Sequence, residues 1–355
     1  MRYLGGQAVQ AQRLLQGLRK LGGLQVRYLE VDPLLPMPFR AMQRVPILRT
    51  LVTSVAYTFA LLRAVPRSDT VHIFSASYWS FLIAPVPALL IGRMFGKRVL
   101  LNYHSGEADD HLTRWGWHVK PLLRLADLLI VPTQYLVDVF GRHGFAAVPI
   151  ANHIDVGEMM VRDRQKMVPR FFSNRNHEAH YNVGAIVAAF AVVKRTFPAA
   201  ELVIAGDGSL RRALEAKVAE LELTDVTFTG PVAPARMPAL YAAADVYVNA
   251  SLIDNMPLSL LEAYGAGVPV VTSDAGGIPW IATDGATASI VPAGDVAALA
   301  AAMIDSVTDP ASAWRRADQA REFVMARFAW DVVSGQWAAA YTGTDAAVVS
   351  RTEEG

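Results

Sequence analysis

Two carboxylates, Asp254 and Glu262, enclose the most informative stretch of this 355-residue chain. Between them, Asn255, Met256 and Pro257 are typical of the beginning of a helix, and Glu262 falls inside that helix. The first N–H groups of a helix have no partner within it and attract anions, so they suit a diphosphate. The two carboxylates can bind hydroxyl groups beside it. These residues predict a site for an anionic, polyhydroxylated ligand such as a nucleotide sugar.

Each carboxylate also has a purely structural interpretation. Asp254 can cap the helix that follows it, and Glu262 can be a solvent-facing helix residue. We favour binding roles for both, because apolar residues surround Glu262 and leave it facing a cleft. A metal site is a further alternative, since His177 and His180 have a usable spacing. No other ligand cluster accompanies these histidines in the sequence, and we therefore expect no metal ion.

Polar or glycine-rich segments follow five predicted strands in the second half of the chain. Parallel strands end at one edge of their sheet, where doubly wound domains bind ligands. One such turn is weak evidence, but several at one edge predict a binding site. There Arg175 can donate charge-assisted hydrogen bonds to phosphates, and Gly206 and Gly208 belong to the second segment. The segments are residues 173–176, 206–208, 229–230, 249–255 and 273–277.

The rest of the chain supplies the scaffold for these loops. Short runs rich in β-branched residues alternate with helical patterns, which predicts parallel sheets covered by helices on both faces. So many strands exceed one ordinary sheet, and we predict two doubly wound, Rossmann-like α/β domains facing a cleft. The predicted strands are 25–31, 70–74, 98–104, 128–132, 147–151, 170–174, 201–206, 225–230, 245–249, 268–272 and 288–292. The predicted helices are 6–20, 46–63, 79–95, 133–142, 182–196, 209–222, 235–243, 258–266, 295–306, 311–328 and 331–341.

The pattern also predicts domain boundaries. Only residues 1–4 precede the turn at Gly5 and Gly6, which is short for a central strand of about 5–6 residues. We therefore expect that the first central strand is truncated and that the native start lies upstream of Met1. The predicted parts are an N-terminal domain (1–151), a linker (152–169), a C-terminal ligand-binding domain (170–330) and a helix that crosses back with a disordered tail (331–355).

The composition limits the possible partners. There is no cysteine, which excludes disulfides and cysteine metal sites and favours a reducing compartment, so we expect a cytoplasmic protein. Residues 1–150 carry 17 Lys/Arg against 8 Asp/Glu, whereas the remainder carries 16 against 24. This asymmetry predicts that the first half meets an anionic surface. Its basic residues alternate with aliphatic rather than aromatic ones, which favours a membrane over nucleic acid.

One segment of the basic half is a candidate for that membrane contact. Residues 45–62 resemble a basic amphipathic helix lying on anionic lipid, which would make the protein peripheral on the inner face of the plasma membrane. An equally good interpretation is a core helix with solvated ends. The uncharged stretch 70–92 is long enough to span a bilayer, but its serines and prolines favour a strand followed by a buried helix. The arginines around the candidate helix are Arg40, Arg44, Arg49, Arg63 and Arg67.

The motifs of the second half resemble the nucleotide-sugar donor domain of the retaining glycosyltransferases of family 4. That family has an acidic residue and a glutamate eight positions later, followed by A-x-G-x-P-V-V, and Asp254, Glu262 and residues 263–271 match this pattern. The resemblance runs from Gly5 to about Tyr341 and implies the two-domain GT-B fold. Further matches are residues 5–7, 103–106, 151–155, 206–208, 228–230 and 328–331.

The resemblance also implies roles for individual residues. Glu262 would bind the nucleotide ribose, whereas the catalytic residues would be His104, Arg175 and Asp254. Arg175 would bind the diphosphate, Asp254 the transferred sugar, and His104 would contact the reacting sugar from the first domain. The alternative for His104 is a structural role, as a core histidine whose ring nitrogens are hydrogen-bonded within the protein. The remaining donor-binding residues would be Gly5, Gly6, Gly206, Gly208, Asn255, Met256 and Leu258.

The chain departs from the family pattern at three positions. Asp254 stands where glutamate is usual, so its reach is shorter. Pro257 stands where glycine is common, which removes one N–H but pre-sets the helix start. His180 occupies the position of a frequent lysine, so one positive charge on the diphosphate is lost unless a protonated His180 supplies it.

The implied reaction is metal-independent transfer of a hexose with retention of configuration, and it needs no cofactor besides the nucleotide-sugar donor. We expect the acceptor to be a lipid-linked glycan or a polysaccharide, as in exopolysaccharide or lipopolysaccharide assembly. Two other functions stay open at this point. A nucleotide-sugar epimerase can use the same scaffold, and a catalytically silent partner protein would fit the missing lysine and the short start.

Overall fold

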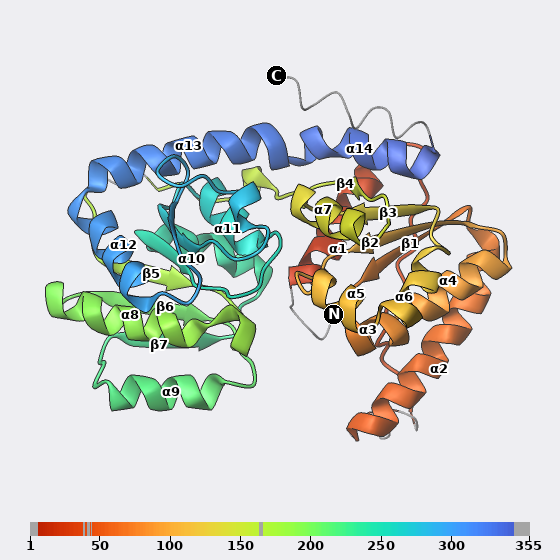
Figure 1. The fold of residues 1–355 in the computed structure, drawn as a ribbon, viewed down its shortest axis with the longest axis horizontal. Coiled ribbons are helices and arrows are strands. Elements are labelled where there is room, and N and C mark those ends of the chain that lie inside the picture. Colours follow the sequence, from red (N-terminus) through yellow and green to blue (C-terminus); the bar gives the residue numbers. More distant parts are fainter. Residues whose placement is uncertain (1–5, 38–39, 41–42, 44, 163–165, 344–355) are drawn as a thin grey trace. The chain divides into compact units, whose positions relative to one another are not determined.

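The computed structural model describes residues 6–37, 40, 43, 45–162 and 166–343, and the chain divides into two compact units (Figure 1). The C-terminal unit contains residues 151–333 together with 6–13, and the N-terminal unit contains 14–150 together with 334–343. The division passes through α1 (Gly6–Lys20) and α14 (Trp330–Thr342). Gly5 and the predicted truncated strand lie outside the described residues.

The C-terminal unit is built on a six-stranded parallel sheet with the order β10-β9-β8-β5-β6-β7. β5 comes first in the chain and lies between β6 and β8, so the strand order reverses there. This is the predicted doubly wound arrangement, whose ligands bind at the carboxyl ends of the strands beside the reversal. The strands are β5 (Arg170–Ser173), β6 (Glu201–Ala205), β7 (Val226–Gly230), β8 (Val246–Asn249), β9 (Val270–Ser273) and β10 (Ser289–Val291).

Two hydrophobic cores cover the two faces of this sheet. Consecutive residues of a strand point to opposite faces, and β5 places Phe171 in one core and Phe172 in the other. Phe171 shares its core with α8, whereas Phe172 shares its core with α10 and α11. Burial on both faces is why the central strands β5, β8 and β9 are mainly apolar, whereas β7, at the edge of the sheet, contains exposed residues. The helices are α8 (Val183–Thr196), α9 (Arg211–Glu220), α10 (Met237–Ala243), α11 (Leu258–Gly265), α12 (Val296–Thr308) and α13 (Pro310–Phe328).

The N-terminal unit contains a four-stranded parallel sheet with the order β1-β2-β3-β4. Among the described residues this sheet therefore shows no reversal of strand order. The strand predicted over 25–31 is wrong, because this segment pairs with no strand in the part of the chain that the structure describes. The strands are β1 (Thr70–Ser75), β2 (Arg98–Tyr103), β3 (Leu128–Val131) and β4 (Val148–Pro149), all within two residues of their predicted ends.

The helices of the N-terminal unit differ from the prediction in two places. The single helix expected over 79–95 is broken at Pro85, which lacks an N–H and disfavours a helical residue before it. A further pair, α5 and α6, was not expected, because the two helices meet at Trp115 and each is too short to show a helical period. The helices are α2 (Pro46–Ala64), α3 (Tyr78–Ile83), α4 (Pro85–Met94), α5 (Ala108–Arg114), α6 (Gly116–Leu123) and α7 (Gln134–Arg142).

At the predicted domain boundaries, the second part of α14 belongs to the N-terminal unit and the predicted linker belongs to the C-terminal unit. In α14, Trp337 is buried in the N-terminal unit, and the hydroxyl of Tyr341 lies 2.6 Å from Nδ1 of His72 on β1. The predicted linker groups with the C-terminal unit, where Ile154 is buried and forms an isolated parallel bridge with Ala329.

Candidate active site

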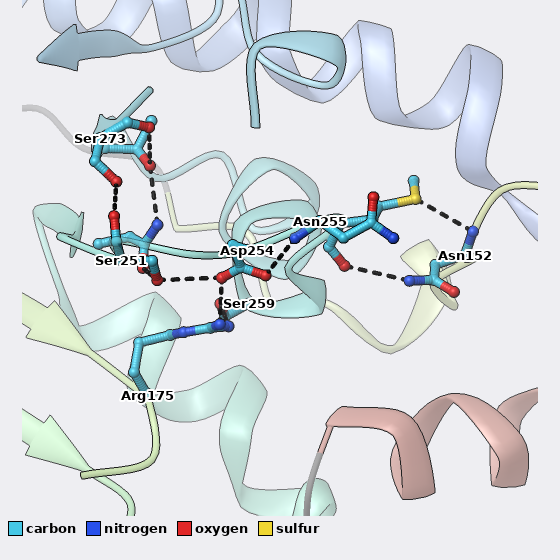
Figure 2. A network of polar contacts seen from close by, with 10 residues as sticks. Asn152, Arg175, Ser251, Asp254, Asn255, Ser259 and Ser273 are labelled. Carbon is cyan, nitrogen blue, oxygen red and sulfur yellow. Dashed lines mark hydrogen bonds and ion pairs between the residues drawn. The ribbon is translucent and has the colours of Figure 1, made fainter. Parts of the chain in front are cut away.

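Arg175 and Asp254, two of the predicted catalytic residues, meet in an ion pair at the carboxyl edge of the C-terminal sheet (Figure 2). Arg175 follows β5, and its Nη1 donates a hydrogen bond of 3.1 Å to Oγ of Ser259 on α11. The guanidinium carbon lies 4.1 Å from the ring centroid of Tyr181, a cation–π contact. The side chain is thus fixed by three partners, which orients its charge.

The pKa of Arg175 follows from these surroundings. Burial lowers this pKa, but the carboxylate of Asp254 and the neighbouring tyrosines together raise it by more, so the pKa lies above its usual value. The guanidinium therefore stays charged at any physiological pH. A permanently charged fork is what a phosphate site requires.

The carboxylate of Asp254 is also anchored by its own loop. Its Oδ1 accepts a hydrogen bond of 3.0 Å from the N–H of Asn255, and its Oδ2 accepts one of 3.1 Å from Oγ of Ser251. Oγ of Ser273 in turn donates to the carbonyl of Ser251 at 2.6 Å (Figure 2). The residue preceding α11 is Pro257, and no side chain caps the helix, so the capping interpretation of Asp254 is wrong.

Glycines allow the loops of the site to pack against each other. Gly276 has a φ of +56°, and a Cβ there would collide with the carbonyl oxygen of Asp254. Gly206 has a φ of +122°, and a Cβ there would lie 2.5 Å from the carbonyl oxygen of Arg175. A Cβ at Gly208 would lie 2.7 Å from the carbonyl oxygen of His177. The predicted donor-binding Gly206 and Gly208 therefore contact the loop that carries Arg175.

Glu262 is buried on α11, with 7% of its surface exposed, which contradicts the interpretation as a solvent-facing residue. Its Oε1 accepts a hydrogen bond of 2.6 Å from Arg13 of α1. Its Oε2 accepts one of 2.9 Å from the hydroxyl of Tyr241 on α10. An ionised carboxylate has about four lone-pair sites, so both oxygens retain capacity for ligand hydroxyls.

Three residues of this network were not predicted from the sequence: Arg13, Tyr241 and Ser259. Arg13 lies 249 positions from Glu262, and nothing in its helical surroundings marks it. Tyr241 and Ser259 carry a weak signal, because each places a hydroxyl in a mainly apolar, buried helix. Buried hydroxyl groups need partners, so such positions point toward polar networks.

The start of α11 has the features expected of a phosphate-binding helix end. Met256 and Leu258 are buried, and the carbonyl of Met256 accepts a hydrogen bond of 3.2 Å from Nδ2 of Asn152 (Figure 2). Asn255 is 3% exposed. The segment before the helix is therefore held in place by its carbonyl groups. The first N–H groups of α11 have no acceptor within the helix.

His180 lies beside Tyr181, the aromatic ring that Arg175 contacts. Its ring centroid is 4.0 Å from that of Tyr181, and its carbonyl accepts a hydrogen bond of 2.7 Å from the N–H of Leu252, in the loop of Asp254. His177 is fully buried against Phe228. Among the described residues, no group of three or more His, Cys, Asp or Glu side chains is arranged to hold a metal ion.

His104 follows β2 in the N-terminal unit. Its N–H donates to the carbonyl of Ser75 at 3.1 Å, and its ring stacks on Phe74 with a centroid distance of 5.3 Å. Its Nε2 is buried and has no hydrogen-bond partner among the described residues. Burial lowers the pKa of His104 to about 4, so the ring is neutral near pH 7. His104 is therefore not the satisfied structural histidine of the alternative interpretation.

Gly6, the other predicted donor-binding residue at the start of the chain, is exposed at the beginning of α1. A Cβ at this position would meet no atom within 4 Å. The described residues therefore give no steric reason for a glycine there, and its role stays a prediction.

Comparison with solved structures shows the fold. Sucrose-phosphate synthase from Thermosynechococcus elongatus superposes with a TM-score of 0.73 at 20% identity, covering 96% of this chain and 93% of that one. Anabaena HepE in complex with UDP-glucose superposes with a TM-score of 0.71 at 17% identity, covering 81% and 82%. The two parallel-sheet units together have the GT-B fold.

Comparison of sequences identifies the family. The family model described as "Glycosyltransferase Family 4" matches residues 4–158, and that described as "Glycosyl transferases group 1" matches residues 170–309. A GDP-mannose-dependent alpha-(1-6)-phosphatidylinositol monomannoside mannosyltransferase of Mycobacterium tuberculosis is 32% identical over 46% of this chain and 44% of its own length. The glycogen synthase of the same organism is 31% identical over 78% of this chain and 69% of its own length. Taken with the geometry of the site, these matches show that the chain belongs to the family 4 glycosyltransferases.

Proposed function

We propose that the protein transfers a sugar from a nucleoside-diphosphate sugar to a lipid-linked or polysaccharide acceptor, with retention of configuration and without a metal ion. One observation carries this proposal. Arg175, Asp254 and Glu262 converge in one buried network at the carboxyl edge of the doubly wound sheet. A guanidinium and two carboxylates in one network match the diphosphate, the transferred sugar and the ribose of such a donor. The solved HepE complex with UDP-glucose supports this class of ligand.

The diphosphate would bind between Arg175 and the start of α11. Arg175 supplies a fixed positive charge, and the helix supplies N–H groups and the positive end of its dipole. In the transfer step the bond between the anomeric carbon and the diphosphate oxygen breaks, and the bond to the acceptor oxygen forms on the same face. The acceptor proton passes to the departing diphosphate. The protein's contribution is to stabilise the negative charge that develops there.

The carboxylates would bind the two sugar rings of the donor. Glu262 accepts hydrogen bonds from the ribose hydroxyls while Tyr241 and Arg13 hold it in place. Asp254 accepts hydrogen bonds from hydroxyls of the transferred sugar, and Asn255 and Ser251 hold its carboxylate. Because both groups are restrained by the protein, little side-chain entropy is lost when a ligand binds.

His104 would act on the transferred sugar as a neutral ring. Since its pKa is lowered to about 4, it carries no charge near pH 7 and exchanges hydrogen bonds with a hydroxyl. Its Nε2 has no hydrogen-bond partner within the described part of the chain, which supports this role. A charged imidazolium would instead repel the positive charge that develops at the anomeric carbon.

The acceptor class is supported by the names of the relatives. One mycobacterial relative is named for a phosphatidylinositol mannoside acceptor, and the other is named glycogen synthase. We therefore propose a glycan acceptor in cell-surface assembly, with the protein in the cytoplasm.

The first experiment is thermal unfolding of the full chain with UDP, GDP and ADP, because a ligand of the folded state raises Tm. The nucleotide that raises Tm selects the donor series for transfer assays with lipid-linked glycans and polysaccharides. NMR of the product then reports the configuration of the new bond, and EDTA is expected to leave the rate unchanged. Asp254→Asn is expected to abolish transfer, whereas Glu201→Gln, at an exposed carboxylate on β6, is expected to keep it.

Other outcomes would contradict the proposal in distinct ways. Conversion of the donor into another nucleotide sugar without any acceptor would identify an epimerase. No rise of Tm with any nucleotide would identify a catalytically silent partner protein. Inversion of configuration, or loss of activity in EDTA, would overturn the retaining, metal-independent mechanism while leaving donor binding intact.

A further inference from the structure

One face of α2 in the N-terminal unit is apolar and exposed. Ile47, Leu51, Val55, Phe59 and Leu62 follow each other at spacings of four or three residues, which places them on one side of the helix. Ile47 is 85% exposed, Leu51 61% and Phe59 70%. Figure 1 shows one end of α2 extending past the other helices of its unit. Single exposed apolar side chains are common, but a continuous stripe of this kind marks an interaction surface.

The opposite face of the helix accounts for its attachment to the unit. Thr53, Tyr57, Leu61 and Val65 follow each other at four-residue spacing and are all buried. The three apolar residues of this set belong to the core of the N-terminal unit. The helix therefore has two apolar faces, and the protein's own core covers one of them. This contradicts the interpretation of the segment as an ordinary core helix with solvated ends.

The charges around the exposed face favour an anionic partner. Residues 45–68 contain three arginines and no acidic residue. Arg63 and Arg67, near the end of the helix, are exposed, as is Arg40 before it. Arg49 is different, because it forms an ion pair with Asp32. Arg44 lies outside the described residues.

We propose that α2 lies in the plane of an anionic bilayer, with the Ile47–Leu51–Val55–Phe59–Leu62 face in the boundary region and Arg63 and Arg67 on lipid headgroups. An exposed apolar stripe with neighbouring basic residues is the pattern of interfacial helices. A second copy of the chain fits less well, because pairing two such faces would bring like charges together. This inference does not depend on the transfer reaction.

An orientation across the membrane is the alternative that length alone permits. The segment Ile47–Arg67 is long and apolar enough to cross a bilayer, but a spanning helix must leave its contacts with the unit. Such a movement would remove Tyr57, Leu61 and Val65 from the core of the N-terminal unit. An in-plane helix keeps these contacts and buries the exposed face.

The test is co-sedimentation of the full chain with vesicles of phosphatidylcholine, with and without phosphatidylglycerol. We expect binding to the anionic vesicles that weakens as salt is raised and is reversed by a salt wash. Leu51→Ser combined with Phe59→Ser is expected to lower the bound fraction on anionic vesicles strongly. Each of Arg63→Gln and Arg67→Gln is expected to weaken binding by about fivefold at low salt.

Matched controls separate the α2 face from general surface hydrophobicity. Met325 and Val332 are exposed to a similar degree as Val55 but belong to the C-terminal unit. Met325→Ser combined with Val332→Ser is expected to leave vesicle binding unchanged. Nucleotide binding of all variants, measured by thermal shift, is expected to match the wild type, which shows that each variant is folded.

Four results would overturn the proposal. The first is that the wild type stays in the supernatant with anionic vesicles at low salt. The second is that Met325→Ser with Val332→Ser loses as much binding as Leu51→Ser with Phe59→Ser. Retention in the pellet after salt and alkaline carbonate washes would indicate a spanning helix. A wild-type dimer that the α2 pair converts to a monomer, without vesicle binding, would identify a second copy as the partner. In each case intact nucleotide binding would leave the proposed transferase function standing.

Discussion

The hydroxyl of Tyr241 lies 2.9 Å from Oε2 of Glu262, and both side chains are buried. Burial raises the pKa of Tyr241 well above its usual value, and the charge of Glu262 raises it further, so the hydroxyl remains a donor. Nδ2 of Asn174 donates to the same hydroxyl at 2.9 Å, and the carbonyl of Ser259 lies 3.0 Å from it, so the hydroxyl is held beside the carboxylate. Tyr241 is therefore a positioning residue for the group that we assign to the ribose.

The substitution Tyr241→Phe is expected to weaken nucleotide binding by about tenfold, because a hydrogen bond to a charged group contributes about 1.5–3 kcal/mol. The loss should appear mainly in the KM for the donor, since the ribose lies away from the reacting bond. Isothermal titration with the nucleotide selected by thermal shift measures the effect.

Tyr264→Phe is the matched control for this change. Tyr264 is a buried tyrosine on α11, in the same core, but its hydroxyl lies 3.3 Å from Oγ1 of Thr287. It should lower stability to a similar extent without altering nucleotide affinity. Equal affinities for the two variants would show that the hydroxyl of Tyr241 does not position Glu262.

Arg175→Lys is expected to lower kcat by about 100-fold, the typical effect of removing one donor that stabilises developing charge. Lysine keeps the charge but not the planar fork, so it cannot contact Asp254, Ser259 and a phosphate together. Steady-state transfer kinetics measure the loss, which should fall on kcat more than on KM.

A second arginine of the same unit provides the control. Arg170 on β5 also pairs with a buried carboxylate, that of Asp245, at 2.7 Å. Arg170→Lys should leave kcat close to that of the wild type. Similar losses in both variants would mean that ion pairing stabilises the unit without acting on the diphosphate.

The sequence predicted the C-terminal unit well, because its central strands are buried on both faces and form short apolar runs. The convergence of Arg175 and Asp254 was also predictable, since both follow strands beside the reversal of strand order. The Arg13–Glu262 contact was not, because no local pattern links residues 249 positions apart. In the N-terminal unit, residues 25–31 contain Val26, Tyr28 and Val31, residue types common in strands, yet composition alone supplies no hydrogen-bonding partner. Whether a segment pairs with another strand depends on which strands the fold brings beside it.

The N-terminal unit is expected to lose stability as the pH falls from about 6.5 toward 4. Burial lowers the pKa of His72 to about 3, and that of His104 and His111 to about 4, from an ordinary 6.5. In this window the unfolded chain takes up protons that the folded unit does not, so stability rises with pH. His104→Leu should flatten the dependence of Tm on pH, measured by calorimetry from neutral pH downward. A variant as steep as the wild type would show that His104 is not held neutral by its burial.

Gly276→Ala tests whether the loops of the site depend on close backbone contact. Gly276 has a φ of +56°, and an added Cβ would collide with the carbonyl of Asp254. Gly285 has a φ of +71°, but an added Cβ there would meet no atom within 4 Å. Gly285→Ala therefore reports the backbone strain alone, about 1–2 kcal/mol in the free energy of unfolding. Gly276→Ala should cost about 1–3 kcal/mol more, because the loop must shift to accept the methyl group.

The same pair of variants also separates stability from function. If the Gly276 contact positions Asp254, Gly276→Ala should raise the KM for the donor and lower kcat, whereas Gly285→Ala should leave both near wild-type values. Urea unfolding and transfer kinetics on the two proteins give the comparison. Equal unfolding free energies with equal kinetics would show that the loop accommodates the methyl group freely. In that case the approach of Gly276 to Asp254 would have no part in placing the carboxylate.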